Sequence, residues 1–522
     1  MSLSGPVICC GSRPAGQTCS ILSGPALVTL NKHIASIPLI ENSPQPLVRR
    51  LPRGWTAEYC FRKLSALEGC VWLDSNMQSA GLCNSGIARY SYLAADPFGR
   101  LRVDQPVGAV LNQVAELLQQ FYQPRLPDLP PMQGGWMGWL GYELGRTFEH
   151  LPAARFNEFQ LPAAALGLYD VVLSWDHAID QGWIISQGWP VTDPLQRARH
   201  AYRRLQEFMR LLEAPTATAK VRQDRQYKVR PSQLAPQFPT RWRQDWTSNF
   251  SAAQFREAVG RCVEYIQAGD IFQVNLSQRL LRPASVPPEQ LYLHLRQRNP
   301  APFSGYADFG RMQVISSSPE RFVQVQDRQI ETRPIKGTRP RLSDPVADAG
   351  IAELLLLSEK DRSENVMIVD LLRNDLSRVA APDSVKVTQL CGLEQYPFVW
   401  HLVSVIQARL GLSLTAADLL AATFPGGSIT GAPKIRAMEI IAELEPTVRG
   451  PYCGSLGYWS FAGDMDSNIL IRTITACDGW WQVPVGGGIV AASDPHLEEQ
   501  ETWHKAEGIL RAIDSLQSHH AL

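Results

Sequence analysis

The chain has 522 residues, of which 45% are hydrophobic and 19% are charged. This length is far above that at which a hydrophobic core becomes hard to bury, so we expect one large or two fused globular domains. Its 50 Lys and Arg residues balance 50 Asp and Glu residues, so no overall field favours nucleic acid or an anionic membrane. A small molecule or another protein is therefore the expected partner.

The ten cysteines are scattered, with neither a CxxC pair nor a His cluster at zinc-binding spacing, which predicts reduced thiols. The apolar runs are much shorter than the roughly 20 residues needed to cross a bilayer, so we expect a cytoplasmic protein. The first forty residues contain no Asp or Glu and are rich in Ser, Gly and Pro. A transit peptide for a plastid or other organelle fits this composition. A poorly ordered extension over residues 1–54 explains the same composition with fewer assumptions.

Residues 55–213 are expected to form an N-terminal lobe. Short runs of β-branched and aromatic residues alternate with turns there and predict strands at 71–74, 88–94 and 165–175. Residues 105–122 carry an apolar stripe at helical spacing, which predicts a helix over a sheet face. The stripe consists of Val110, Val114, Leu117, Leu118 and Phe121. A second helix is predicted at 194–213.

Pro, Thr, Gln and Arg dominate residues 214–245, and this composition predicts a linker because it cannot bury a core. Residues 246–522 are long enough for a complete second domain, which begins with a helix over 252–268 capped by Ser251. The strands are not regularly separated by helices, which disfavours a Rossmann fold or a TIM barrel. Two lobes of mixed sheet and helix are predicted.

Two pairs of carboxylates lie on predicted helices. Asp361 and Glu364 are three residues apart and share a helix face, as do Glu498 and Glu501. Two such faces brought together offer the oxygen ligands that Mg²⁺ requires. Solvated helix surface is the alternative interpretation, because acidic residues at this spacing usually face water.

Two glycine-rich segments are candidate anion sites. Gly486, Gly487 and Gly488 come just after a predicted strand, where their backbone amides could approach a carboxylate, although a turn or bulge explains them equally well. The loop at 424–434 precedes a helix that Ser428 or Thr430 could cap. We interpret this loop as structural, with anion binding at the helix N-terminus as a second interpretation.

A lysine framed by Pro, Ile and Gly stands in the strand-like segment Thr332-Arg-Pro-Ile-Lys-Gly-Thr-Arg. If Lys336 points inward, desolvation and neighbouring cations lower its pKa and make it nucleophilic. A lysine that faces solvent is the alternative, because lysines are seldom fully buried.

These segments, in this order, resemble the chorismate-utilising enzymes, which include component I of anthranilate synthase and of aminodeoxychorismate synthase, and the isochorismate and salicylate synthases. The resemblance covers about residues 55–516 and includes the motifs GGWMGWLGYELGR at 134, IFQVNLSQR at 271, SSPERF at 317 and VDLLRNDLSRV at 369. It implies an α+β, two-lobed anthranilate synthase component I-like fold with a β-sandwich core flanked by helices. It also implies chorismate as the substrate and Mg²⁺ as the cofactor.

The resemblance assigns roles to individual residues. Glu364 and Glu501 match the Mg²⁺ ligands of the family, with Asp361 and Glu498 one helical turn away as indirect or water-mediated partners. The positions that match substrate contacts are Gln273, Gly337, Thr338, His401, Tyr458, Arg472, Lys505 and the backbone of Gly486, Gly487 and Gly488.

Two positions discriminate among the reactions of the family. Gln273 stands where members that activate water have a lysine base, and glutamine cannot abstract a proton at neutral pH. Lys336 stands in Pro-Ile-Lys-Gly-Thr, which resembles aminodeoxychorismate synthases, whereas anthranilate synthases resemble Pro-Ile-Ala-Gly-Thr. The resemblance implies that neutral Lys336 attacks C2 of chorismate as the C4 hydroxyl leaves, and that ammonia then enters at C4 and expels the lysine. Glu320 matches the general acid/base of the family, and a salt bridge to Arg321 or Arg333 is its alternative interpretation.

The implied product is 4-amino-4-deoxychorismate, a precursor of 4-aminobenzoate and folate. No cysteine has the surroundings of an amidotransferase nucleophile, so ammonia is expected either free from solution or from a glutamine amidotransferase partner subunit. Anthranilate synthase component I is the alternative activity, and a non-catalytic subunit that binds chorismate or tryptophan is the alternative of a different class. Residues 72–75 and 299–303 also resemble the two segments of a tryptophan pocket, with Ser75, Pro300 and Phe303 as candidate lining residues, although Asp74 departs from the family pattern.

Overall fold

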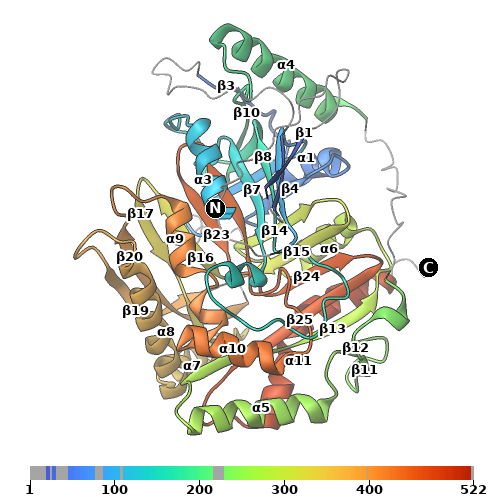
Figure 1. Ribbon diagram of the computed structural model, residues 1–522, viewed down its shortest axis with the longest axis vertical. Helices are drawn as coiled ribbons and strands as arrows, with labels where there is room; N and C mark the ends of the chain where they lie inside the picture. The colour runs from blue at the N-terminus through green and yellow to red at the C-terminus, as the bar shows by residue number, and fades with distance from the viewer. Residues whose placement is uncertain are drawn as a thin grey trace, which may run out of the picture.

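Two large antiparallel sheets form the centre of the molecule in the computed structural model, which describes residues 19–23, 26–30, 45–76, 86–105, 110–215, 229–396 and 398–518 (Figure 1). The first sheet has 12 strands. In pairing order they are β1 (Cys19–Ser23), β2 (Ala26–Leu30), β6 (Gly99–Val103), β8 (Ala164–Tyr169), β7 (Gly135–Leu140), β22 (Ser455–Ser460), β23 (Met465–Asn468), β16 (Arg321–Gln326), β17 (Gln329–Thr332), β20 (Val399–Arg409) and β18 (Ile335–Pro340), with β19 (Lys386–Gln395) also paired to β20.

The second sheet has 13 strands. In pairing order they are β11 (Phe238–Pro239), β12 (Thr247–Ser248), β13 (Gln273–Pro283), β25 (Trp480–Ile489), β24 (Thr473–Cys477), β15 (Met312–Ser318), β14 (Phe303–Asp308), β4 (Val71–Asp74), β5 (Tyr90–Ala94), β9 (Val171–Asp176), β10 (Gln181–Ser186) and β3 (Leu47–Arg50), with β21 (Gly431–Ala432) paired to β13. Both sheets therefore contain strands from before and after the predicted linker.

Helices surround the two sheets (Figure 1). They are α1 (Ala57–Leu64), α3 (Val110–Gln120), α4 (Pro194–Glu213), α5 (Ala252–Gln267), α6 (Pro288–Arg298), α7 (Pro345–Leu356), α8 (Glu359–Ser377), α9 (Ala416–Thr423), α10 (Lys434–Leu444) and α11 (Pro495–Ser518), with short 3-10 turns η1 (Tyr142–Thr147), η2 (Pro231–Gln233) and η3 (Gly427–Ile429). One hydrophobic cluster lies under α3, α5, α8, α9 and α10, and a second lies under α1, α4, α6 and α11.

A third hydrophobic cluster lies between the sheets. Trp139 and Leu456 reach it from the first sheet, and Val71 and Val314 reach it from the second. Side chains from the inner faces of two sheets that meet in this way form the interior of a β-sandwich. The predicted α+β fold with a β-sandwich core flanked by helices is therefore confirmed.

Most of the predicted elements are present, with one informative difference. The strand expected at 71–74 is β4, and the helices expected at 194–213 and 252–268 are α4 and α5, the latter capped by the Ser251 hydroxyl through a capping box. The single strand expected at 165–175 is wrong, because the chain forms β8 in one sheet and β9 in the other. The switch occurs at Asp170, a buried carboxylate that pairs with Arg204 of α4.

The predicted segment boundaries do not coincide with edges of the sheets. Part of the N-terminal extension forms β3, which pairs with β10, while residues 1–18, 24–25 and 31–44 lie outside the described residues. Within the linker, residues 216–228 lie outside them too, but β11 pairs with β12 and Ala235 is buried. In the described part of the chain, none of the helices has the length and hydrophobicity that a membrane span requires.

Candidate active site

Lys336 lies in strand β18, which pairs with β20. The register shifts between Lys336 and Thr338, and Gly337 between them has a positive φ of 77°, so the strand has a bulge at this point. The Lys336 Nζ donates a hydrogen bond to the Ser428 carbonyl oxygen at 3.2 Å. Burial lowers the pKa of the Lys336 ammonium, against the opposing effect of nearby Glu364 and Glu320, so the structure agrees with an inward-pointing lysine.

Glu320 lies between β15 and β16 and is 5% exposed. Burial raises the pKa of this carboxyl group from 4.5 to about 7, although a hydrogen bond from Ser428 and the charge of Lys336 both lower it. The Ser428 hydroxyl donates to Glu320 Oε1 at 2.7 Å. A group with a pKa near neutrality is suited to give and take a proton.

The alternative interpretation of Glu320, a salt bridge, does not hold. Arg321 instead pairs with Asp466 and Glu331, at 3.0 and 2.9 Å. Arg333 pairs with Glu394 at 2.5 Å. Both guanidinium groups therefore have other carboxylate partners, and Glu320 faces Lys336.

Carboxylates from α8 and α11 converge beside β25. A Cβ atom added to Gly487 would lie 3.4 Å from Glu498 Oε2 and 3.5 Å from Glu501 Oε1, so the glycine leaves space next to both. Glu364 on α8 interacts electrostatically with Glu501, and burial together with this like charge raises the pKa of Glu364. Lys505 pairs with Glu501 at 2.6 Å. The two acidic helix faces expected from the sequence thus meet.

This acidic cluster fits a magnesium ion that shares its coordination with water and substrate. Among the residues described here, no group of three or more His, Cys, Asp and Glu encloses a metal position. Mg²⁺ does not need such a cage, because it is usually held by one or two carboxylates and keeps several water molecules. Glu364 and Glu501 can supply those two. Asp361 pairs with Arg339 at 3.1 Å, Glu498 accepts a hydrogen bond from Ser493 at 2.6 Å, and Glu501 pairs with Lys505 at 2.6 Å, so three of these four carboxylates also have a protein partner.

The three consecutive glycines lie inside β25, not just after a strand as the sequence predicted. They pair with Ser277, Leu276 and Asn275 of β13. A Cβ atom at Gly488 would lie 2.2 Å from Gln273 Nε2, so a larger residue would displace the Gln273 side chain. Gln273 is buried, and its Oε1 has no hydrogen-bond partner within the described part of the chain. The Gly486 carbonyl accepts a hydrogen bond from Lys505.

His401 and Arg472 extend the site, with His401 beside Thr338 and Arg472 near Glu501. The His401 Nδ1 is 2.9 Å from the Thr338 hydroxyl, and the Tyr396 ring packs edge-on against the imidazole. Burial, helped by the charge of Arg472, lowers the pKa of His401 to about 4, so the imidazole is neutral at physiological pH. Arg472 interacts electrostatically with Tyr452 and with Glu501. Its φ of 54° is rare for a residue with a side chain.

The predicted substrate contact of Tyr458 is not supported by its position. Tyr458 belongs to β22, and its ring packs against Tyr92 at 5.2 Å in the sandwich interior. Tyr452, which precedes this strand, is the tyrosine that interacts with Arg472. Both tyrosines lie within one short segment, but Tyr452 lies in the turn before β22 whereas Tyr458 lies inside the strand.

The loop at 424–434 also differs from the prediction. Helix α10 begins at Lys434 after Pro433, and neither Ser428 nor Thr430 caps it. Ser428 instead bonds to Glu320, and the Thr430 hydroxyl donates to the Gly426 carbonyl. Six cysteines are free and buried, namely Cys60, Cys70, Cys262, Cys391, Cys453 and Cys477, and burial raises the pKa of Cys453 to about 12. Such a thiol is a poor nucleophile.

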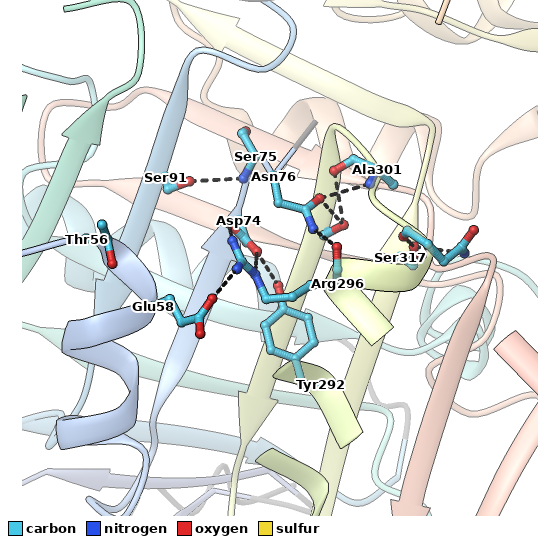
Figure 2. Close-up of polar contacts among 12 residues, drawn as sticks. Thr56, Glu58, Asp74, Ser75, Asn76, Ser91, Tyr292, Arg296, Ala301 and Ser317 are labelled. Atoms are coloured by element: carbon cyan, nitrogen blue, oxygen red, sulfur yellow. Dashed lines mark hydrogen bonds and ion pairs between the residues drawn. The ribbon is translucent and has the colours of Figure 1, made fainter. Parts of the chain in front are cut away.

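The segments that resemble a tryptophan pocket line a separate cavity of about 330 Å³. Ser75, Phe303 and Tyr458 line it, and Pro302 takes the place expected for Pro300. Figure 2 shows that Asp74 is bound to α6, where it accepts hydrogen bonds from Tyr292 and Arg296 at 2.9 and 2.8 Å. The Ser75 hydroxyl donates to the Pro302 carbonyl, which joins the two segments.

Comparison with known proteins identifies the family to which this chain belongs. A family model described as chorismate binding enzyme matches residues 71–511. The chain belongs to the chorismate-binding enzyme family. Aminodeoxychorismate synthase component 1 of Salmonella typhimurium is 44% identical over 489 residues, which cover 90% of this chain and 99% of that protein. Anthranilate synthase component 1 of Streptomyces coelicolor is 41% identical over 432 residues, which cover 82% of each chain.

The fold of this family member agrees with solved structures. Anthranilate synthase component I from Streptococcus pneumoniae is similar with a TM-score of 0.64 and 27% identity, covering 92% of this chain and 94% of that one. The menaquinone-specific isochorismate synthase of Escherichia coli is similar in fold alone, with a TM-score of 0.65 at 18% identity and coverage of 90% and 95%. Because relatives with different names have nearly equal identity, overall similarity identifies the family and not the reaction.

Proposed function

We propose that this chorismate-binding enzyme transfers ammonia to chorismate and forms 4-amino-4-deoxychorismate. The observation that carries the proposal is the pairing of Lys336, whose pKa is lowered by burial, with Glu320, whose pKa is raised to about 7. A lowered pKa increases the fraction of Lys336 that is the neutral, nucleophilic amine, and Glu320 can supply a proton near neutral pH. Both side chains contact Ser428.

The reaction begins when the Lys336 nitrogen bonds to C2 of chorismate. The ring double bonds shift, the C4–oxygen bond breaks, and Glu320 gives its proton to the departing hydroxyl, which leaves as water. Ammonia then bonds to C4, the double bonds shift back, and the C2–nitrogen bond to Lys336 breaks. The enolpyruvyl group is retained throughout. Gln273 cannot abstract a proton from water at neutral pH, so it supports ammonia rather than water as the incoming group.

The remaining side chains bind and orient the substrate in this proposal. Arg472, Lys505 and the backbone of β25 around Gly487 receive its carboxylates, and neutral His401 is oriented by Thr338. Glu364 and Glu501 hold Mg²⁺, which when bound supplies positive charge to a substrate carboxylate and fixes its position. The relatives are named component 1, and we propose a glutamine amidotransferase subunit as the partner that supplies ammonia. The product would then lead to 4-aminobenzoate and folate.

One incubation distinguishes this activity from the alternatives. The chain is mixed with chorismate, Mg²⁺ and an ammonium salt at alkaline pH, and anthranilate fluorescence is followed before and after addition of a lyase that converts aminodeoxychorismate to 4-aminobenzoate. We expect 4-aminobenzoate only after the lyase is added. Anthranilate as the main product would instead assign the chain as an anthranilate synthase component I. Unchanged chorismate would favour a non-catalytic chorismate- or tryptophan-binding subunit.

We also propose that the cavity beside Ser75 and Phe303 binds tryptophan. Its volume of about 330 Å³ and its mixture of aromatic and polar lining residues suit an aromatic amino acid. Isothermal titration calorimetry with tryptophan, and with phenylalanine as the control ligand, tests this site. Absence of heat with tryptophan at millimolar concentration would contradict it.

A further inference from the structure

Ser428 is bonded to two of the side chains that carry the proposed reaction. It lies in η3, is 8% exposed, and uses a different group for each bond. Its hydroxyl donates to Glu320 Oε1 at 2.7 Å, and its backbone carbonyl accepts from Lys336 Nζ at 3.2 Å. Glu320 and Lys336 belong to separate segments of the first half of the second lobe, so Ser428 joins them through a third segment.

The two bonds have distinct consequences for the reacting groups. A hydroxyl that donates to Oε1 stabilises the charged carboxylate, and in the protonated acid it leaves the proton on Oε2. That second oxygen is then the one that can donate to a departing hydroxyl. The carbonyl holds one N–H of Lys336 and so limits the directions in which the nitrogen lone pair can point. Together the bonds fix the acid and the nucleophile relative to each other.

The loop around Ser428 is built to hold this position. A Cβ atom at Gly427 would lie 2.7 Å from a Leu371 methyl group on α8, and one at Gly426 would lie 2.8 Å from an Ile469 methyl group. The loop is therefore tightly packed against α8 and Ile469, and this packing restricts movement of Ser428. Thr430 closes the loop internally, since its hydroxyl donates to the Gly426 carbonyl.

We propose that Ser428 is a positioning residue that orients the Glu320 acid through its hydroxyl and the Lys336 nucleophile through its carbonyl. This inference rests on the proposed function and assigns a role to a residue outside the reacting pair. The groups that face Glu320 are Lys336 from β18 and the buried Cys453 thiol before β22, and the Arg321 guanidinium is bound to other carboxylates. The neutral hydrogen-bond donors to this acid are thus the Ser428 hydroxyl and the backbone N–H of Ile335, and Ser428 is the donor that a side-chain substitution can remove.

The test is the pH profile of chorismate consumption by Ser428→Ala, at saturating Mg²⁺ and a constant concentration of free ammonia. The substitution removes the hydroxyl bond and keeps the carbonyl bond, so the carboxylate loses a donor and binds its proton more tightly. Glu320 must be protonated to act, and therefore the alkaline limb of kcat should move to higher pH. We expect kcat below pH 7 to fall by about 10- to 100-fold, because the carboxylate that forms as Glu320 gives up its proton lacks the hydroxyl bond that stabilises its charge, with KM for chorismate changed less than about threefold.

Three further variants keep the test decisive. Ser428→Thr retains a hydroxyl and should restore the wild-type alkaline limb, and Ser428→Cys, with a weaker donor of similar size, should give an intermediate limb even if the alanine variant does not fold. Thr423→Val is the matched control, since it removes a buried hydroxyl that donates to the Leu419 carbonyl within α9 and does not touch Glu320 or the Ser428 loop, and its alkaline limb should coincide with that of the wild type.

An unchanged alkaline limb in both the alanine and the cysteine variants would overturn the inference, as would an equal shift in Thr423→Val. A rise in KM alone would do so as well, because it would assign Ser428 to substrate binding. Absence of any chorismate consumption by the wild-type chain would instead contradict the proposed function, so the two failures are distinguishable.

Discussion

Replacing Glu320 by glutamine should make the protein more stable at alkaline pH while it abolishes turnover. The raised pKa of Glu320 means that the folded protein holds a proton that the unfolded chain releases. Below pH 4.5 the group is protonated in both states and has no effect on stability. As the pH rises from 4.5 to about 7 the unfolded state binds fewer protons, so the free energy of unfolding falls, and above pH 7 the full penalty of a buried carboxylate remains.

The size of this penalty follows from the two pKa values. The difference between 4.5 and about 7 corresponds to roughly 3 kcal/mol at 1.36 kcal/mol per pH unit. Glutamine has nearly the same shape, carries no charge and can still accept the hydrogen bond from Ser428. With an unfolding entropy of roughly 2.1 cal/mol/K per residue over 522 residues, this gain raises Tm by about 3 °C.

Calorimetric melting of the two proteins at pH 4.5 and pH 8.5 measures the effect. We expect Glu320→Gln to melt close to the wild type at the lower pH and above it at the higher pH, with chorismate consumption reduced by about 100-fold or more. Glu445→Gln is the control of opposite sign, because Glu445 is in a buried pair with Arg449 at 2.7 Å and its neutralisation should cost several kcal/mol. A Glu320→Gln variant that melts below the wild type at pH 8.5 would refute the reasoning.

Other substitutions test the remaining parts of the site. Lys336→Ala should reduce aminodeoxychorismate formation by at least about 100-fold, measured by product chromatography, since it removes the nucleophile, and an undiminished rate would exclude the covalent step. Gly337→Ala and Gly310→Ala each place a side chain at positive φ, so each should lower the free energy of unfolding by roughly 1–2 kcal/mol in chemical denaturation. A Cβ atom at Gly337 would also lie 3.0 Å from Asp361, whereas one at Gly310 would meet nothing within 4 Å. Gly337→Ala alone should therefore lose turnover. Tyr452→Phe should lower kcat/KM for chorismate by about tenfold in steady-state kinetics, whereas Tyr458→Phe should leave it unchanged. The reverse pattern would support Tyr458 as the substrate contact, as the sequence predicted.

The sequence was sufficient for the fold class and for the elements with strong periodicity. Helices α4 and α5 were predicted within one residue because capping residues and apolar stripes are local signals. The exchange of the chain between sheets at Asp170 could not be predicted, because it depends on long-range strand pairing: β8 pairs with β6 and β7, whereas β9 pairs with β5 and β10. The segment 165–175 looks like one strand as long as the two sheets are unknown.

The candidate site was predictable only in part for the same physical reason. Motif resemblance located Lys336, Glu320 and the two acidic helices, and the structure brings them together. The motif alone did not show that Tyr452 lies in the turn before β22 near Arg472 while Tyr458 lies inside the strand, so Tyr458 was chosen. The role of Ser428 was missed because its two bonds reach segments about a hundred residues away, and the only local signal was a helix cap that it does not form.

The contacts of Lys336 bear on how one residue can decide the product. Alanine at this position, as in the anthranilate-type motif, would remove the nucleophile and also leave the Ser428 carbonyl without the Nζ donor and Glu320 without its nearest positive charge. A buried carboxylate that loses such a cation binds its proton more tightly. The change from lysine to alanine therefore alters both the covalent step and the acidity of the general acid. Converting one activity to the other should then require adjustment at Ser428 as well as at Lys336, so we expect Lys336→Ala alone to form anthranilate only slowly.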